Sequence, residues 1–205
     1  MKIAVFVSGG GTNLQAIIDK IGNGEITNVE IAEVIASNDK AYAIERAKKA
    51  GIPSKVISKK ELGDAYDDTT LQELNNLGVD LVVLAGFLSM LGPKTVAAYA
   101  NRIINIHPAL IPAFCGKGMY GIRPHEAALA KGVKVSGATV HFVNEHYDEG
   151  PIILQKTVDV LDDDTPETLQ KRIMVECEQV ILPKAIQLIA DGKIEVVNNL
   201  VRVVK

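Results

Sequence analysis

The first hundred residues alternate between short apolar runs and segments in which apolar residues recur every three or four positions. The runs predict strands that are buried on both faces of a sheet. They lie at 2–7, 29–36, 55–58, 80–85 and 102–107. The segments between them predict amphipathic helices, at 14–21, 41–50, 66–77 and 93–100. Such alternation favours right-handed crossovers, so we expect an open, mostly parallel, doubly wound α/β sheet with helices on both faces.

The pattern changes at residues 108–122, which show no period and hold two prolines and three glycines. A long loop without regular structure is uncommon unless it is functional. The rest of the chain predicts a helix at 124–131, strands at 135–143 and 152–160, a helix from Thr165 to Ala190, and a terminal hairpin. No repeat or linker interrupts the chain, so we expect one domain, 1–205, with halves at 1–100 and 101–205.

Charge and composition narrow the possible partners and location. There are 22 Lys and Arg residues against 25 Asp and Glu, and aromatic residues are 4% without tryptophan. This weighs against a nucleic-acid partner and against a base-stacking platform. The chain has only two cysteines and no apolar stretch long enough for a membrane helix or a secretory leader. We therefore expect a cytoplasmic protein without a membrane or disulfide framework.

The glycine-rich stretch Ser8-Gly9-Gly10-Gly11-Thr12-Asn13 falls between the first predicted strand and the first predicted helix. Glycines let the backbone approach a ligand closely, and a helix start offers free N–H groups, so the stretch predicts a phosphate site. The dinucleotide pattern G-x-G-x-x-G fails at Leu14, and no P-loop pattern is present. A tight turn without a ligand is the alternative interpretation.

Asn105 and His107 stand two apart at the end of a predicted strand, so both side chains point to one face. Ligands of open parallel sheets bind at these strand ends. Asn donates, and His donates or carries a proton near neutral pH, so the pair suits acyl transfer. Polar residues merely satisfied at a strand end are the alternative. Asp148 could support His107 only if the turn at 144–151 reaches it.

The remaining histidines and cysteines give weaker signals. His125 and His146 lack metal-ligand spacing, so we expect no metal. His141 is interpreted as a structural histidine in the middle of a strand. Cys115 is a conceivable nucleophile for which no base can be assigned, and Cys177 is expected in the core.

These residues together resemble the phosphoribosylglycinamide formyltransferase family of folate-dependent enzymes. The resemblance covers nearly the whole chain. It rests on SGGGTNLQAII (8–18), VVLAGF (82–87), NIHPALIP (105–112), GATVHFV (137–143), DEGPIILQ (148–155) and the helix that contains Glu178. It implies one formyltransferase domain, with a phosphate-binding first half and a catalytic, folate-binding second half.

The resemblance also implies an activity and a set of site residues. The family transfers the formyl group of 10-formyltetrahydrofolate to the amine of 5′-phosphoribosylglycinamide in purine biosynthesis, with small-molecule substrates only. The catalytic residues fall on Asn105, His107 and Asp148. The substrate-binding residues fall on Gly11, Thr12, Asn13 and Glu178. The folate site falls on Leu88, Ser89, Met90, Leu91, Asn105, Asn144 and Asp148. The protein is expected as a monomer or homodimer.

The chain departs from the family at the folate tail and in the long loop. Gly63 and Ser89 stand where some members carry arginines that meet the glutamyl tail, and Lys59, Lys60 or Lys117 could substitute for them. Cys115-Gly116 replaces a Pro-Gly of some members.

Three other functions are compatible with parts of this pattern. A formyltetrahydrofolate deformylase usually carries an added N-terminal domain, and a methionyl-tRNA formyltransferase needs a tRNA-binding domain. A silent phosphate-binding module on the same fold is the third alternative. The joint presence of Asn105, His107 and Asp148 counts against this last interpretation.

Overall fold

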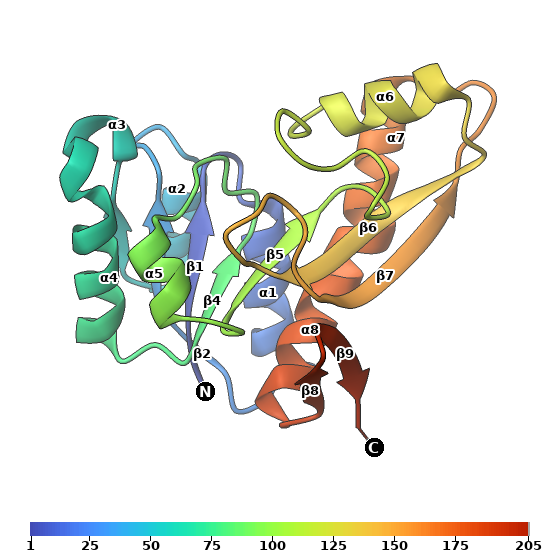
Figure 1. Cartoon of the computed structure of the whole chain (residues 1–205). Helices are drawn as coiled ribbons and strands as arrows, with labels where there is room; N and C mark the ends of the chain where they lie inside the picture. The colour runs from blue at the N-terminus through green and yellow to red at the C-terminus, as the bar shows by residue number, and fades with distance from the viewer. Residues whose placement is uncertain (205) are drawn as a thin grey trace. The chain divides into compact units, whose positions relative to one another are not determined.

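Parallel strand pairing in the first hundred residues follows from the apolar runs. The computed structural model describes residues 1–204, and the helices and strands are labelled in Figure 1. The first elements are β1 (Lys2–Val7), α1 (Thr12–Gly22), β2 (Glu30–Ala36), α2 (Ala43–Lys49), β3 (Ser54–Val56), α3 (Lys59–Leu62), η1 (Gly63–Ala65), α4 (Tyr66–Leu77), β4 (Leu81–Leu84), α5 (Pro93–Ala98) and β5 (Ile103–His107). Every pairing among β1 to β5 is parallel.

The later elements form a second group. They are α6 (Arg123–Lys131), β6 (Val135–Phe142), β7 (Ile152–Asp159), α7 (Pro166–Ile173), the π-helical segment η2 (Met174–Glu178), α8 (Gln179–Ala190), β8 (Ile194–Val197) and β9 (Leu200–Val203). The main sheet has the order β3-β2-β1-β4-β5-β6-β7, and β8 and β9 form a separate hairpin. The chain separates into two compact units, of which the first ends at Asn105, within β5.

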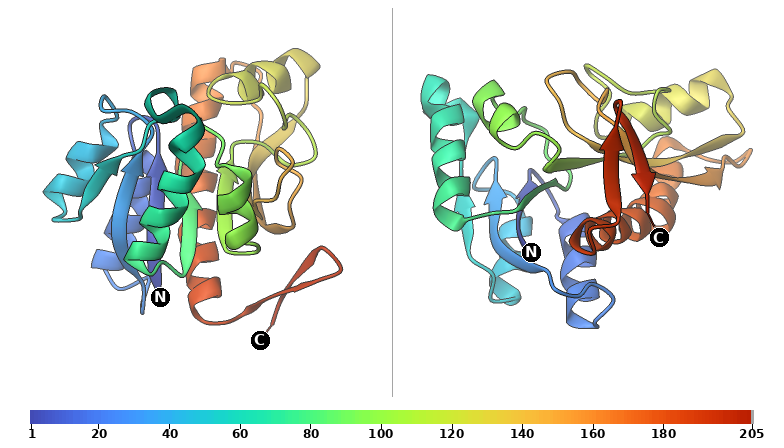
Figure 2. Two further views of the ribbon diagram at one scale, coloured as in Figure 1. Left: turned by 60° about the vertical axis from the view of Figure 1, so that its left-hand side comes forward. Right: turned by 60° about the horizontal axis from the view of Figure 1, so that its bottom comes forward.

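The first unit is a doubly wound α/β layer structure. Its central strands β1 and β4 are almost wholly buried; Val5 and Phe6 of β1 and Val83 of β4 have no exposed surface. Helices α1 and α2 pack together on one face of the strands, and α4 and α5 pack together on the other (Figure 2). The predicted sheet is confirmed, because apolar strands need cover on both faces.

The second unit is organised around one antiparallel pair. Strands β6 and β7 pair along nearly their whole length, with a bulge between Val140 and His141. Helices α7 and α8 pack against these strands, and α6 packs against α7. No helix within residues 1–204 is long and apolar enough to cross a membrane.

The predicted long helix is present but is not uniform. Thr165 caps it, with its side chain accepting from the Thr168 N–H, and Pro166 is the first helical residue. The α-helical hydrogen bonding then changes to π-helical over Met174–Glu178 before α8 begins. Pro183 in α8 lacks the N–H that would bond to the carbonyl of Gln179, so the regular ladder is broken there. The short α3 was not predicted, because four residues carry no periodic signal.

Candidate active site

His107 and Asp148, which are far apart in sequence, lie together in the second unit. His107 ends β5 and is 4% exposed, and Asp148 lies in the turn between β6 and β7. The His107 Nδ1 atom is 3.7 Å from Asp148 Oδ2. Spacing alone left open whether Asp148 could reach His107, and the structure shows that it does.

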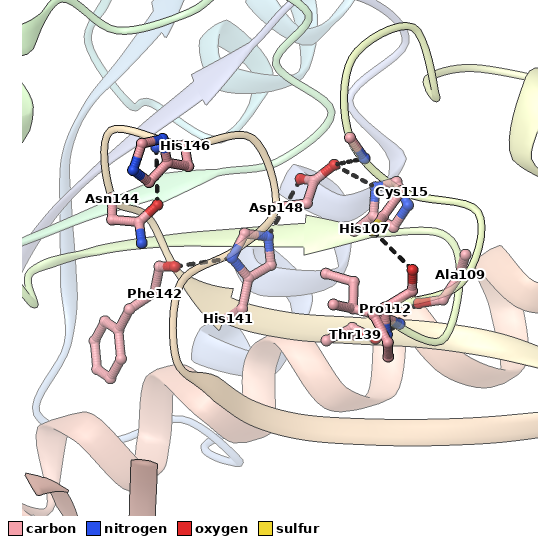
Figure 3. A network of polar contacts seen from close by, with 12 residues as sticks. His107, Ala109, Pro112, Cys115, Thr139, His141, Phe142, Asn144, His146 and Asp148 are labelled. Atoms are coloured by element: carbon pink, nitrogen blue, oxygen red, sulfur yellow. Dashed lines mark hydrogen bonds and ion pairs between the residues drawn. The ribbon is translucent and has the colours of Figure 1, made fainter. Parts of the chain in front are cut away.

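His141 is the functional candidate that the sequence interpretation missed. It is the second-last residue of β6, not mid-strand, and the bulge beside it lies at the turn that carries Asp148. Its Nε2 atom is 3.5 Å from Asp148 Oδ1, and its Nδ1 donates to the Phe142 carbonyl at 2.8 Å. Figure 3 shows the two imidazoles on either side of the carboxylate. Its place beside that turn was the only available sequence signal.

Burial and charge set the protonation states of this cluster. Burial lowers the pKa of His107, and the nearby Asp148 carboxylate only partly opposes this effect. Burial alone would raise the pKa of Asp148, but its contacts with His141, His107 and the Gly116 N–H outweigh burial and hold it below the usual range. At neutral pH the cluster therefore consists of a neutral His107 beside an ionised Asp148.

The hydrogen bond of His107 assigns its tautomer. Its Nε2 lies 2.9 Å from the Phe114 carbonyl oxygen, which can only accept, so Nε2 carries the proton. Nδ1 is then unprotonated and faces Asp148 at a distance too long for a direct hydrogen bond. A proton arriving on His107 would bind at Nδ1, where the carboxylate stabilises the imidazolium.

Two residues in polar contact with His107, Phe114 and Asp148, have a left-handed backbone. Phe114 has a φ of 50° and Asp148 a φ of 56°, both in the left-handed region. Aspartate tolerates this region, but a bulky phenylalanine rarely adopts it. The strain is held in part by the Gly116 N–H, which donates to Asp148 Oδ2 at 2.8 Å. Strained backbone of this kind is characteristic of functional sites.

The long loop 108–122 is anchored at its start. The Thr139 hydroxyl donates to the Ala109 carbonyl at 2.7 Å and accepts the Ile111 N–H at 3.1 Å. Gln155 in β7 donates to the Ile111 carbonyl and to Thr139. The loop therefore leaves β5 along a fixed path, which places Phe114 over His107.

Gly150 has a specific steric reason to be glycine. A Cβ atom at this position would lie 1.8 Å from the Phe142 carbonyl oxygen. Because the turn that carries Asp148 passes so close to β6, no other residue fits without moving the turn. In the Asp-x-Gly-Pro stretch, Asp148 thus supplies the carboxylate, and Gly150 allows the close packing of the turn on β6.

The glycine-rich stretch at residues 8–13, called the glycine loop below, belongs to the first unit and has the features of an anion site. Gly11 caps α1 with a φ of 71°, and Thr12 is the first helical residue. The N–H groups of Gly9, Gly10 and Gly11 form no hydrogen bond within residues 1–204. A Cβ at Gly9 or Gly10 would meet nothing within 4 Å, so the loop surface is open. Asn13 is buried at its base.

The residues expected at the folate site lie in two places. Leu88, Ser89, Met90 and Leu91 follow β4 in the first unit, where Leu88 is 63% exposed and its N–H donates to Ser8 Oγ at 2.8 Å. Asn144 lies in the turn of the second unit, and its side chain accepts from the His146 N–H at 3.0 Å. Asn105 is half-buried and precedes His107 by two residues on β5.

Glu178 is buried at the end of the π-helical segment. A π-turn inserts extra backbone into a helix and changes the direction of its side chains, and such turns occur often at functional sites. Cys177 is fully buried, as expected. Burial and the carboxylates of Asp148 and Glu149 raise the pKa of the Cys115 thiol, so it is a poor nucleophile. No group of three potential metal ligands occurs within residues 1–204.

His125 in α6 is buried, and neither ring nitrogen has a hydrogen-bond partner among the described residues. Burial, with a smaller contribution from His107, lowers its pKa from 6.5 to about 4. His125 therefore binds a proton near pH 6.5 in the unfolded chain but only near pH 4 in the folded chain. Protonation favours the unfolded chain in this range, so the stability that the neutral His125 allows is complete above about pH 6.5 and is lost as the pH falls toward 4.

We expect His125 to lower the free energy of unfolding by about 2 kcal/mol when the pH is lowered from about 7.5 to about 5. Urea unfolding at both pH values measures the drop. The His125→Phe variant should lose that part of the pH dependence, whereas His146→Gln, at an exposed histidine, should keep it. An unchanged slope in His125→Phe would show that another group carries the acid sensitivity.

Comparisons with known proteins point to one enzyme family. Residues 1–186 match the family described as formyl transferase. The chain is 40% identical over 201 residues to a phosphoribosylglycinamide formyltransferase of Haemophilus influenzae, covering 97% of this chain and 92% of that protein. It is 44% identical over 178 residues to the chloroplastic enzyme of the same name from Arabidopsis thaliana, covering 85% of this chain. It spans only 61% of that relative.

A solved structure is also similar throughout. The glycinamide ribonucleotide transformylase 1 of Symbiobacterium toebii superimposes with a TM-score of 0.93 at 42% identity, covering 100% of this chain and 94% of that one. The fold predicted from the hydrophobic pattern is therefore confirmed by a solved relative as well.

Proposed function

The chain belongs to the formyl transferase family, and we propose that it transfers the formyl group of 10-formyltetrahydrofolate to the amine of 5′-phosphoribosylglycinamide. The products are the N-formyl compound and tetrahydrofolate, as a step of de novo purine (IMP) biosynthesis. The observation that carries the proposal is the Asp148 carboxylate, whose side chain is 12% exposed and lies between His107 and His141. It occurs in a chain similar over nearly its full length to enzymes named for this reaction.

The chemistry requires an oxyanion to be stabilised and one proton to be moved. The neutral amine attacks the formyl carbon, the carbonyl oxygen becomes an oxyanion, and the bond from that carbon to N10 of the folate then breaks. Asn105 and the Nε2–H of His107 are the proposed donors to this oxygen. One such donor is typically worth about 3 kcal/mol in the transition state.

We expect the formyl oxygen to take the position of the Phe114 carbonyl oxygen beside His107 Nε2. This carbonyl accepts a hydrogen bond from the His107 Nε2–H at 2.9 Å. A substrate carbonyl can replace it only if the loop backbone moves, and the left-handed φ of Phe114 favours such a release. Asp148 then stabilises the proton lost by the amine on its way to the leaving nitrogen.

The binding roles follow the same assignment. We propose that the N–H groups of Gly11, Thr12 and Asn13 bind the phosphate and that Glu178 binds the glycinamide amine. The exposed Leu88 and Met90, with Ser89, Leu91, Asn105, Asn144 and Asp148, are the proposed folate contacts. The protein would act in the cytoplasm without a metal, as a monomer or homodimer.

The deciding experiment mixes the purified protein with both substrates and follows the release of tetrahydrofolate, beside a control without the amine substrate. Release that depends on the amine supports the transferase. Equal release without the amine, with formate as product, would identify a hydrolase instead. Folate binding without release in either tube would leave a binding module.

A further inference from the structure

Four consecutive carbonyl groups of the glycine loop are all occupied by donors. The Ser8 carbonyl accepts from the Asn38 side chain at 3.0 Å, and the Gly9 carbonyl from the Ala43 N–H at 3.1 Å. The Gly10 carbonyl accepts from Arg46 Nε at 2.7 Å, and the Gly11 carbonyl from the Gln15 N–H at 2.9 Å. With its carbonyls engaged in this way, the loop presents unpaired N–H groups at its open surface, which is the arrangement an anion needs.

Arg46 is the one charged side chain among these donors. It projects from α2, and its Nη1 also donates to the Gln15 side chain at 3.1 Å in the first turns of α1. Its Cδ lies 3.3 Å from where a Cβ of Gly11 would stand, so the side chain packs directly behind the loop. The guanidinium carbon lies 5.3 Å from the centre of the Tyr42 ring, which restricts its orientation.

The contact of Arg46 with the loop has two physical consequences. It fixes the Gly10 peptide, whose two flanking residues are also glycines and would otherwise have many accessible conformations. It also places a permanent positive charge behind N–H groups that face a bound anion. A planar guanidinium can do both at once, because one nitrogen holds the carbonyl while another holds Gln15.

We propose that Arg46 is a positioning residue that sets the affinity of the glycine loop for the substrate phosphate. The inference rests on the proposed function, because that function supplies the phosphorylated substrate. Arg46 binds the carbonyl side of the loop, and the phosphate binds the N–H side. Its effect therefore falls on the binding of the phosphate and not on the transfer of the formyl group.

Steady-state kinetics of Arg46→Gln test this proposal, with phosphoribosylglycinamide, the same riboside without phosphate, and 10-formyltetrahydrofolate. The KM for the phosphorylated substrate should rise about tenfold to a hundredfold. The kcat and the KM for the folate should stay within about twofold, and activity on the unphosphorylated riboside should not change. Competition by inorganic phosphate should weaken in parallel.

Lys49→Gln is the matched control. Lys49 lies on the same helix and over the same Tyr42 ring at 5.9 Å, but its side chain forms no hydrogen bond with the loop within residues 1–204. This variant removes one positive charge and should leave every KM within about twofold. Equal effects of the two substitutions would reduce the role of Arg46 to general charge and would overturn the proposal.

Three further results would also overturn it: an unchanged KM in Arg46→Gln, a loss of kcat alone, or an equal loss with the unphosphorylated riboside. Thermal unfolding of each variant separates these results from a failure to fold. Wild-type turnover in the same assay tests the proposed function by itself. An inactive wild type would contradict the proposed function. An active wild type whose KM does not change in Arg46→Gln would contradict only the proposed role of Arg46.

Discussion

Replacing Asp148 with asparagine is expected to lower kcat by about a hundredfold or more. Asparagine keeps the size of the side chain and tolerates the left-handed backbone of this position, which has a φ of 56°. What it removes is the negative charge between His107 and His141. Without that charge, a proton arriving on His107 Nδ1 loses its stabilising partner, so the step that moves the proton becomes slower.

The same variant gives a second readout that a merely structural role would not produce. The Asp148 carboxylate opposes the effect of burial on His107, so its removal should lower the pKa of His107 further. Titration by NMR measures this shift. Glu149→Gln is the matched control, because it removes an exposed carboxylate from the next residue in the chain. Full activity of Asp148→Asn, or an equal loss in Glu149→Gln, would contradict the proposed proton relay.

The hydrophobic pattern predicted the fold well because the central strands of the first unit, β1 and β4, are buried on both faces. An apolar run such as 80–85 has few alternatives to a central parallel strand, and the glycines that follow the predicted helices mark their ends clearly. The prediction misses elements that are too short to show a period or that keep the apolar pattern of an ordinary α-helix. The four residues of α3 show no period, and the π-helical segment keeps an apolar face that reads as ordinary helix.

The candidate site was only partly predictable from the residues. Asn105 and His107 could be paired because the period of a strand is fixed, so residues two apart share a face. The contact of His107 with Asp148 depends on how the turn after β6 folds back. Gly150 allows this path, because the turn passes too close to the Phe142 carbonyl oxygen for any larger residue. Sequence spacing carries no information on such a contact.

His141 is a second residue whose proximity to Asp148 could not be predicted from the sequence. Its position on an apolar strand predicted a structural histidine, and the side chain is indeed buried at 2% exposure. The bulge at Val140 and His141 changes the local register and places the ring next to Asp148. A bulge of one residue leaves no mark in the hydrophobic pattern, so only the structure reveals the second imidazole.

The His107→Ala variant is the second large effect we expect. It removes a proposed oxyanion donor, so kcat should fall by about a hundredfold to a thousandfold while either KM changes by less than about threefold. Initial rates at saturating and limiting substrate separate the two parameters. His146→Ala is the control, since it deletes an exposed imidazole from the turn near Asp148. An unchanged kcat in His107→Ala would remove His107 from the chemistry.

Combining His107→Ala with Asp148→Asn identifies the imidazole through which Asp148 acts. The carboxylate is 3.7 Å from His107 and 3.5 Å from His141, so distance alone does not choose between them. If Asp148 works through His107, the double variant should be no slower than His107→Ala, because residues that act as a unit are not additive. A further loss of tenfold or more, on the order of 1.4 kcal/mol, would instead assign a separate part of the proton transfer to Asp148 with His141.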